Sequence, residues 1–425
     1  MNRGAEAYQA YMYSYPHKTA YRPLEGIDLA GPLERSFRDV PPDLYIHIPF
    51  CGRKCGFCNL FSAAGADDES LSRYTAALCA QFERMGLAGK RFRNITVGGG
   101  TPLLLNPADL ARLLPLAEGR RWVETSPAGA SEEKLAILRN FRTERVSLGV
   151  QSLNGDELVR LGRSGDTAAL HGALRRIRAA GFPRLNVDLI YGIPGQSVSS
   201  LEATLRGVLR YEPEEIFLYP LYIRRGTALY GQKPNGEIRG LYFYGRDLLA
   251  AAGYAQRSMR QFAKNPPEDS AGCGLDDMIG LGCGARTYLG NLHFSRPYAA
   301  DREEALRIIG AYTEDGGNPA PPGGSLHGFI LNEDEQRRRF IIKNLFHYRG
   351  LSINDYRNYF ATDPREDFSL FAELREQGFV EEHPESAAPD VFLRLTETGL
   401  SLSDMIGPRF ISPAVRARMN AWRPG

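Results

Sequence analysis

Between residue 44 and about residue 220, short apolar runs alternate with segments whose apolar residues recur every three or four positions. The apolar runs have the length of strands: Leu44–Ile48, Asn94–Val97, Trp122–Thr125, Arg145–Val150, Leu185–Tyr191 and Glu215–Tyr219. The periodic segments are typical of amphipathic helices: Glu69–Met85, Pro107–Leu116, Ser131–Asn140, Thr167–Ala180 and Ser199–Arg210. Strands separated by helices of this length predict βαβ units and a parallel sheet. Six such units predict an α/β fold, a partial (β/α)6 barrel of the TIM type, in which ligands gather at the C-terminal ends of the strands.

The segments outside this alternation divide the chain into further parts. Residues 1–43 carry prolines that exclude a long helix, so we expect an extended N-terminal arm. Residues 44–312 then hold the barrel with an extension, and residues 313–330 have the composition of a linker. Residues 331–425 show helical patterns followed by a hairpin around Phe379–Leu395, which predicts a small winged-helix-like α+β domain.

The N-terminal arm is rich in tyrosine and contains the polar pair His17–Lys18. One interpretation is that its aromatic side chains pack on the surface of the core. A sharper hypothesis is that the stretch YSYPHKTAYRP covers the mouth of the active site.

Composition narrows the class of protein. A hydrophobic content of 43% and a charged content of 24% are ordinary for a soluble globular protein. The net charge of +2 gives no argument for a nucleic-acid or membrane partner. The N-terminus has no continuous apolar segment of the signal-peptide kind, and no run approaches the length of a membrane span. We therefore expect a cytoplasmic protein that acts on a small molecule.

The loop after the first predicted strand, in the stretch YIHIPFCGRKCGFCNLFS, contains Cys51, Cys55 and Cys58. Three cysteines in one short loop can supply three thiolate ligands to one iron–sulfur cluster, which leaves one iron with an open coordination site. Isolated cysteines are more often buried apolar residues or disulfides. A structural zinc site would need four protein ligands, and no matching cysteine pair follows at the usual spacing. The pattern favours the cluster.

Polar motifs follow the other predicted strands. The run Gly98–Pro102 (GGGTP) follows the second strand and lets the backbone approach a ligand. Glu124 lies at the end of the third strand, Gln151 at the end of the fourth, and Asp188 inside the fifth. An unpaired carboxylate within an apolar strand is costly. Asp188 therefore needs a partner, either Arg163 or a ligand.

The cysteine loop resembles that of radical S-adenosylmethionine (SAM) enzymes, and the string YIHIPFCxxxCxFC resembles their oxygen-independent coproporphyrinogen III oxidase-like (HemN/HemW-like) family. The resemblance implies a [4Fe-4S] cluster held by the three cysteines, which are then the catalytic residues. It implies that the open iron binds SAM, and that one electron cleaves SAM to methionine and a 5′-deoxyadenosyl radical. A flavodoxin- or ferredoxin-type protein is expected to supply that electron.

The resemblance also assigns residues to SAM. Its first-site residues correspond to Tyr45, Gly99, Gly100, Thr101 and Glu124 here. Residues that line a second SAM site in the coproporphyrinogen enzyme correspond to Phe57, Gln151, Arg163 and Asp188, and Leu221 completes the expected set. The chain is therefore expected to bind one SAM molecule and plausibly two.

Departures from the family pattern guide the choice of reaction. The porphyrinogen decarboxylase has a further cysteine where this chain has Leu60, and the heme chaperone has a heme motif that this chain lacks. The segments CGFCNLFS and GLGCGARTY look most like the class C methylase and cyclopropanase branch. That resemblance implies a second SAM as methylene donor, used to alkylate an sp2 carbon of an aromatic or heteroaromatic substrate. A tetrapyrrole oxidoreductase and a heme chaperone remain the alternatives.

Cys79, Cys273 and Cys283 lie outside the motif. Cys79 falls in a helical pattern that looks buried. We interpret Cys273 and Cys283 as structural or substrate-facing thiols, because a second cluster would need more ligands than these.

Overall fold

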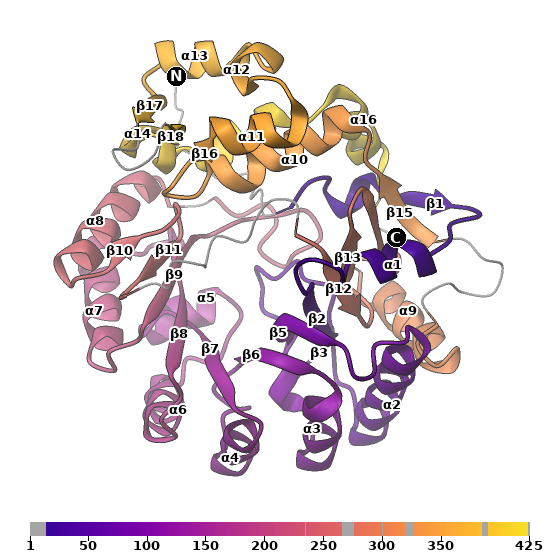
Figure 1. The fold of residues 1–425 in the computed structure, drawn as a ribbon. Coiled ribbons are helices and arrows are strands. Elements are labelled where there is room, and N and C mark those ends of the chain that lie inside the picture. The colour runs from indigo at the N-terminus through magenta and orange to yellow at the C-terminus, as the bar shows by residue number, and fades with distance from the viewer. Residues whose placement is uncertain are drawn as a thin grey trace.

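The computed structural model describes residues 14–233, 235–265, 276–299, 301–318, 326–384 and 390–423. A curved 13-stranded sheet runs through it in the order β1-β15-β14-β13-β12-β2-β5-β6-β7-β8-β9-β11-β10 (Figure 1). Its centre consists of the six predicted strands, all parallel: β2 (Asp43–Ile48), β5 (Arg91–Gly99), β6 (Glu118–Thr125), β7 (Thr143–Gln151), β8 (Arg184–Tyr191) and β9 (Glu215–Pro220). The predicted partial barrel is confirmed.

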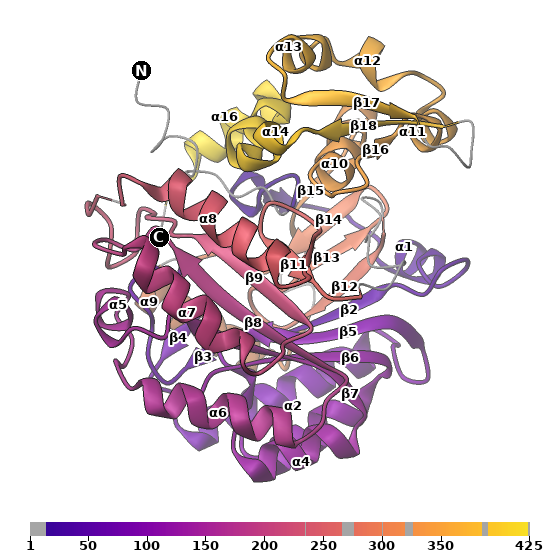
Figure 2. The same cartoon turned by 90° about the vertical axis from the view of Figure 1, so that its left-hand side faces the viewer.

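Helices cover the outer, convex face of this sheet (Figure 1). They are α2 (Asp68–Arg84), α3 (Pro107–Leu113), α4 (Glu132–Asn140), α6 (Thr167–Ala179), α7 (Val198–Leu209), α8 (Ile238–Ala251) and α9 (Arg302–Glu314). The short helix α5 (Gly155–Arg160) lies instead at the end of the strands, after β7 (Figure 2). Side-chain caps begin most of them: Asp67 accepts from the Ser70 amide, and Ser197 forms a capping box with Ser200. The helices begin close to where the sequence predicts them, because the caps and the apolar spacing agree.

Residues of each parallel strand alternate between the two faces of the sheet. Those that face the helices are buried, as in Leu44, Ile46 and Ile48 of β2. At the alternate positions, on the inner face of the curve, His47, Ser147 and Asn186 are buried. Other side chains there keep part of their accessible surface: Tyr45, Thr96, Trp122, Glu124, Arg145, Asp188, Phe217 and Tyr219. An ordinary TIM barrel fills its interior with apolar side chains. Here part of the inner face stays accessible, and it carries polar groups.

Antiparallel strands extend the sheet on both sides. Beyond β2 lie β12 (Met278–Leu281), which is parallel to β2, then β13 (Arg286–Leu289), β14 (Leu292–Ser295), β15 (Leu326–Ile330) and β1 (Arg22–Leu24). Beyond β9 lie β11 (Gln261–Ala263) and β10 (Ala255–Gln256). Two short strands, β3 (Phe50–Cys51) and β4 (Ala63–Ala64), pair with each other separately.

The strands that extend the sheet include part of the predicted linker, so the predicted linker bounds were wrong. Residues 326–330, expected in the linker, form β15 and pair with β14 and β1 inside the sheet. Residues 319–325, which include most of the Gly- and Pro-rich segment, lie outside the described residues. The alternation of apolar and polar residues in LHGFI is short and follows the prolines directly, so composition concealed the strand.

The C-terminal part lies across the open side of the curved sheet (Figures 1 and 2). Its strands β16 (Leu351–Ser352), β18 (Val391–Leu395) and β17 (Val380–Pro384) form a sheet in that order. Its helices are α10 (Glu333–Leu345), α11 (Ile353–Phe360), α12 (Pro364–Asp367), α13 (Leu370–Glu376), α14 (Glu397–Ser401), α15 (Ser403–Ile406) and α16 (Pro413–Ala421). Helices followed by a hairpin agree with the predicted winged-helix-like α+β pattern.

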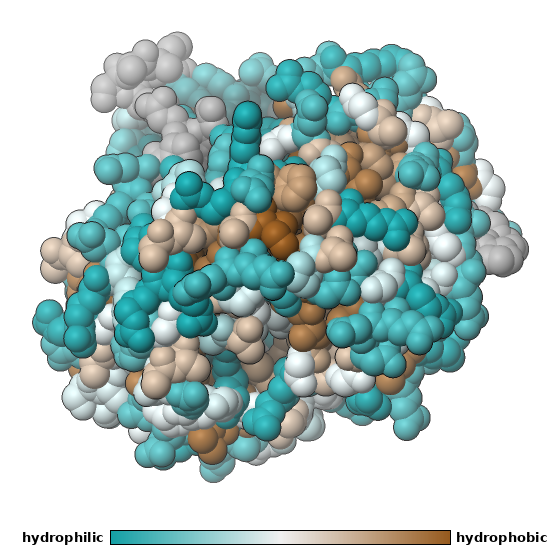
Figure 3. Space-filling view, turned by 90° about the horizontal axis from the view of Figure 1, so that it is seen from below, coloured by the Kyte–Doolittle hydropathy of each residue, from teal (hydrophilic) through white to brown (hydrophobic). Residues whose placement is uncertain are grey.

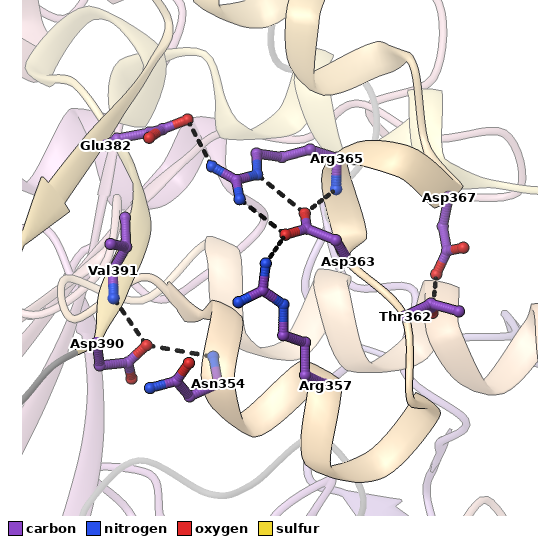
Figure 4. Close-up of polar contacts among 9 residues, drawn as sticks. All are labelled: Asn354, Arg357, Thr362, Asp363, Arg365, Asp367, Glu382, Asp390 and Val391. Atoms are coloured by element: carbon purple, nitrogen blue, oxygen red, sulfur yellow. Dashed lines mark hydrogen bonds and ion pairs between the residues drawn. The ribbon is translucent and has the colours of Figure 1, made fainter.

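A polar network holds the loops of this part together (Figure 4). Asp363 is 5% exposed and accepts hydrogen bonds from Arg357 and Arg365, and Arg365 also reaches Glu382 at 3.0 Å. These hydrogen bonds lower the pKa of Asp363 to about 2. The bond with the Arg365 side chain has the largest effect. The network is internal to the C-terminal part, so it stabilises the position of α11 and β17 rather than a ligand.

Two sets of contacts tie the C-terminal part to the rest. Tyr15 of the arm donates a hydrogen bond to Glu335 of α10, whose other carboxylate oxygen accepts from Ser412 at 2.7 Å. Asp404 accepts from Arg260 and, at 2.5 Å, from Tyr222. The arm, the barrel and the C-terminal part are thus joined through buried polar groups, which are strong only when fully paired.

The surface formed by the outer helices is mainly hydrophilic, with small separate apolar areas (Figure 3). None of the helices in the described part of the chain has both the length and the apolar character that crossing a membrane requires.

Candidate active site

The cysteine loop begins where β2 ends, at the C-terminal edge of the sheet. Backbone hydrogen bonds fix it from several sides: the Ala63 amide donates to Pro49 at 2.7 Å, and the Gly56 amide donates to Leu161 at 2.9 Å. Cys51, Cys55 and Cys58 are all free of disulfides and only partly buried. The loop therefore holds three accessible thiols on a backbone anchored to two neighbouring segments.

The three thiols influence one another. Burial raises the pKa of Cys58 to about 11, and the neighbouring Cys55 and Cys51 contribute to that rise. Burial likewise raises the pKa of Cys51, whereas hydrogen bonds with the Thr101 and Ser62 side chains lower it. Thiolates in such a place need a positive partner, which iron supplies. In the described part of the chain no three His, Cys, Asp or Glu side chains are close enough to ligate a single metal ion. Three free thiols on one anchored loop nevertheless fit a larger cluster.

The three glycines at the end of β5, Gly98 and Gly99 within the strand and Gly100 directly after it, each make room for a different group. A Cβ atom at Gly98 would lie 2.7 Å from the Glu124 carboxylate, and one at Gly99 would lie 2.7 Å from the His47 ring. A Cβ atom at Gly100 would lie 2.4 Å from the Phe50 carbonyl oxygen and 2.9 Å from the Cys51 sulfur. Gly99 also has a φ of +114°, which side chains rarely adopt. The glycine run is therefore fitted against the cysteine loop and is not a simple turn.

Glu124 lies on the inner face of β6 and accepts a hydrogen bond from the Gly99 amide at 3.1 Å. Burial, and then the charge of Asp188, raise its pKa to about 7, while the Gly99 amide and Arg145 act in the opposite direction. A carboxyl with this pKa is only partly ionised near pH 7, and a nearby cation would favour its charged form. The amino group of SAM is such a cation.

Gln151, Arg163 and Asp188 meet at the ends of β7 and β8. The register of this strand pair shifts between Gly149 and Gln151, and Gln151 has a φ of +70°. Such a bulge redirects a side chain and is common at functional sites. A Cβ atom at Gly149 would lie 2.9 Å from the Gln151 amide nitrogen and 3.7 Å from Arg163. The structure therefore brings these residues together.

The partner of Asp188 differs from the one that the sequence suggested. Asn186 donates a hydrogen bond to its carboxylate at 2.9 Å, whereas Arg163 donates to the Gly149 carbonyl oxygen at 2.9 Å. Burial raises the pKa of Asp188, and Asn186 opposes that rise, followed by Arg145 and Arg163. Arg163 thus acts on Asp188 at a distance, and the carboxylate keeps room for a ligand.

Phe57 and Leu221 lie in one small apolar cluster beside this group. Its buried members are Leu161, Ile190, Ile193, Leu221 and Leu229, and Phe57, Tyr219 and Ile223 pack against them. The Leu221 amide donates to the Tyr191 carbonyl oxygen at 2.8 Å. The predicted second-site residues thus form an apolar part and a polar part that adjoin the cysteine loop.

Tyr45 and Thr101 adjoin the same loop through different neighbours. The Tyr45 hydroxyl is 3.2 Å from His47 Nδ1, and the Thr101 amide donates to the Phe50 carbonyl oxygen at 2.7 Å. Leu60, where the porphyrinogen decarboxylase has a cysteine, is 44% exposed.

Sequence reasoning missed His47, which lies between Gly99 and Gly284. Its Nε2 is 2.8 Å from the Phe61 carbonyl oxygen, so this nitrogen carries the hydrogen and Nδ1 accepts from Tyr45. Burial lowers the pKa of His47 to about 4, so the ring is neutral at physiological pH. The sequence did contain one signal for His47: it lies two positions after Tyr45 in the same predicted strand, so the two side chains share a face of the sheet.

The arm lies next to the cysteine loop. Lys18 stacks 3.2 Å from the centre of the Tyr298 ring, and Tyr298 donates a hydrogen bond to the carbonyl oxygen of Asn59, one residue after Cys58. Burial and the charges of Arg286 and Arg224 lower the pKa of Lys18, and Cys58 acts the other way. This placement favours the hypothesis that the YSYPHKTAYRP stretch covers the site.

Cys283 is fully buried beneath α9, and its thiol donates to the Ile308 carbonyl oxygen at 3.7 Å. Burial raises its pKa. It is a structural thiol, as is the buried Cys79. Cys273 lies outside the described residues.

Known proteins resemble both the site and the fold. The sequence signature of the Radical SAM superfamily matches residues 45–208. The oxygen-independent coproporphyrinogen III oxidase of Paracoccus denitrificans is 30% identical over 326 residues, which cover 70% of this chain and 67% of that protein. The heme chaperone HemW of Escherichia coli is 31% identical over 271 residues, 58% of this chain and 70% of that protein. The structure of the Escherichia coli coproporphyrinogen III oxidase HemN shares the fold, with a TM-score of 0.78 at 23% identity, and covers 94% of this chain and 96% of that one.

These relatives correct one expectation. They do not support the class C methylase and cyclopropanase branch, which short motifs around the cysteines had suggested. Short motifs shared across a superfamily carry little information on the reaction. A [4Fe-4S] cluster and SAM are the cofactors that the family implies. The chain belongs to the radical SAM superfamily, in the group of the oxygen-independent coproporphyrinogen III oxidases and HemW.

Proposed function

We propose that the chain is a radical SAM oxidoreductase that acts on a tetrapyrrole, as its coproporphyrinogen oxidase relatives are named for doing. One observation carries the proposal: inner-face side chains from Tyr45 of β2 to Tyr219 of β9 keep part of their accessible surface, where a barrel would normally be packed. A bulky substrate needs such a space beside the cluster.

Different residues of the site have different proposed roles. Cys51, Cys55 and Cys58 hold the cluster, which when bound supplies the electron for cleaving SAM. Glu124 and the Gly99 backbone orient the amino end of SAM, since the carboxylate faces the glycine run. Gln151, Arg163 and Asp188 provide hydrogen-bonding groups for a ribose, and Phe57 and Leu221 an apolar wall. The proximity of these groups to the cysteine loop supports a second SAM molecule.

Alkylation with SAM as methylene donor is a second candidate that needs the same two SAM molecules, and it rests only on the CGFCNLFS and GLGCGARTY segments. A heme-chaperone role, in line with the name of the HemW relative, is a third. The absence of the heme motif from the sequence counts against it.

Anaerobic reconstitution followed by three assays separates these functions. Carbon dioxide release from coproporphyrinogen III, together with 5′-deoxyadenosine, is the result that we expect. Deuterium transfer from methyl-labelled SAM into 5′-deoxyadenosine would instead favour alkylation. Stable heme binding without SAM cleavage would overturn the enzymatic proposal in favour of the chaperone role.

A further inference from the structure

Arg145 lies in the middle of the inner face, between the strand that carries Glu124 and the strand that carries Asp188. It belongs to β7, which has β6 on one side and β8 on the other, with β9 beyond β8 (Figure 1). Its side chain is 16% exposed. A cation that is mostly removed from water is costly unless other groups hold it. The contacts of Arg145 therefore indicate what it does.

Two aromatic rings contact the guanidinium group of Arg145. Its central carbon is 5.4 Å from the centre of the Trp122 ring and 5.7 Å from the centre of the Phe217 ring. Trp122 pairs with Arg145 across β6 and β7, and it precedes Glu124 by two positions, on the same face of β6. Phe217 pairs with Asp188 across β8 and β9. Cation–π contacts with these rings hold the guanidinium beside both carboxylate-bearing strands.

An ion pair holds the guanidinium from a further direction. Arg145 Nη2 lies 2.9 Å from a carboxylate oxygen of Glu215, and the other oxygen of Glu215 lies 3.2 Å from Arg184. Two positive charges thus share one negative charge, which leaves one positive charge over. Arg145 Nε is buried and has no hydrogen-bond partner among the described residues. The ion pair therefore fixes Arg145 without neutralising the group.

The groups that face Glu124 come from both neighbouring strands of β6. On the side of β5, the Gly99 amide donates a hydrogen bond to Glu124 at 3.1 Å, and the His47 ring is neutral because burial lowers its pKa to about 4. On the other side lie Arg145 and Asp188. Burial and then the charge of Asp188 raise the pKa of Glu124, whereas the Gly99 amide and Arg145 lower it.

Asp188 responds to the same cation. Burial raises its pKa, whereas the hydrogen bond from Asn186 and the charges of Arg145 and Arg163 lower it. Glu215 raises it further. Arg145 therefore acts on both carboxyl groups of the inner face, in the direction that favours their charged forms.

We propose that Arg145 is a positioning residue of the SAM site, which keeps Glu124 and Asp188 in the charged form that binds SAM. Its clamp of two rings and one carboxylate holds a positive charge between the two strands. The inference rests on the proposed role of these carboxylates toward SAM. Without Arg145, two partly buried carboxylates on the same face repel each other, and one retains its proton near pH 7.

The test measures SAM binding to the reconstituted full-length protein at pH 6, 7 and 8.5, with iron content as the check on loading. Arg145→Gln is compared with Glu215→Gln, because the two changes break the same ion pair but alter the local charge in opposite directions. Arg184→Gln is the matched control. It removes the other arginine on Glu215, which lies four residues before Asp188, about 13 Å along the strand. Each variant is compared with wild type at the same pH, so that titration of SAM itself cancels.

We expect the affinity of the wild type for SAM to be half-maximal near pH 7, the pKa of Glu124. Arg145→Gln raises this midpoint by about one pH unit. It therefore binds SAM about fivefold more weakly than wild type at pH 7, but within about 1.5-fold at pH 8.5. Glu215→Gln lowers the midpoint and binds SAM about twofold more tightly at pH 6. Arg184→Gln keeps the wild-type midpoint.

A purely structural role for Arg145 predicts a different result. Damage to the fold weakens SAM binding by the same factor at every pH, and it does so for Arg145→Gln and Glu215→Gln alike. That outcome, or an equal shift of the midpoint in Arg184→Gln, would overturn the inference. If Arg145→Gln does not fold, a midpoint that is unchanged or raised in Glu215→Gln overturns it instead.

Glu124→Gln separates this inference from the proposed role of Glu124. A wild-type pH dependence in Glu124→Gln would refute that role. Loss of the pH dependence in Glu124→Gln, together with unmoved midpoints in Arg145→Gln and Glu215→Gln, would leave the role of Glu124 intact and refute the inference alone.

Discussion

Two regions beside the cysteine loop differ in charge and in how the chain builds them. On the inner face of the strands, burial raises the pKa of both Glu124 and Asp188. On the arm, burial and then like charges lower the pKa of Lys18. In each case burial makes the charged form less favourable than it would be in water, and an opposite charge that binds nearby would offset this cost. The carboxyl groups have Arg145 beside them in the same sheet, whereas Lys18 lies against the Tyr298 ring.

Glu124, Arg145 and Asp188 lie on neighbouring strands of one parallel sheet, which fixes their order. Lys18 and Tyr298 come from the arm and from the segment before α9, which are far apart in the sequence. A position on a strand has a fixed place in the barrel, whereas the arm reaches the cysteine loop only once distant segments have docked. Substitutions on the strands should therefore change SAM binding directly, and those on the arm should change it only if the arm covers the site.

The largest effect is expected at the cysteine loop. Cys55→Ala removes one of three cluster ligands, so iron content falls and SAM cleavage drops by about a thousandfold or more. Cys283→Ala changes a buried thiol that bonds the Ile308 carbonyl oxygen and is not a cluster ligand, so it keeps its iron and its activity. Iron analysis and 5′-deoxyadenosine formation measure both. A Cys55→Ala protein that still cleaves SAM would refute the cluster assignment.

Glu124 should make SAM binding depend on pH. Below pH 7 the free carboxyl, with a pKa of about 7, is protonated and must lose its proton to bind the amino group of SAM. The affinity for SAM should therefore fall by about fivefold between pH 7 and pH 6, and the loss approaches about tenfold per pH unit further below the pKa. Glu124→Gln should bind SAM about a hundredfold more weakly at pH 7.5 and should lose this dependence. Titrations between pH 6 and 7.5 check this, and identical slopes for both proteins would contradict it.

Gly99 and Gly89 form a matched pair for the glycine run. Both have positive φ, +114° and +75°, but a Cβ atom at Gly89 meets nothing within 4 Å whereas one at Gly99 meets the His47 ring at 2.7 Å. Gly89→Ala should cost about 1 kcal/mol of stability through the backbone alone. Gly99→Ala should cost about 1–3 kcal/mol more, because the ring must move. Thermal unfolding compares them, and equal Tm values would show that the contact is unimportant.

The sequence by itself determined the barrel and the acidic side of the site. Apolar runs such as Leu185–Tyr191 and capped helices such as the one after Asp67 are local signals, and strand ends must meet at one edge. The pattern of the chain alone therefore places near one another Cys51, Cys55, Cys58, Gly99, Glu124, Gln151 and Asp188. It also indicates that Asp188 needs a partner, but the identity of that partner depends on how the strands pack.

Only the tertiary structure decided what surrounds these residues. Nothing local distinguishes Arg145 from the other charged residues of β7, or Lys18 from the other cations of the arm. Their state depends on which elements close over them, and for the arm that depends on contacts between residues such as Tyr15 and Glu335, 320 positions apart. Desolvation and charge repulsion are properties of the assembled site. The sequence predicted where SAM would bind, and the docking of distant segments decided what lies opposite those residues.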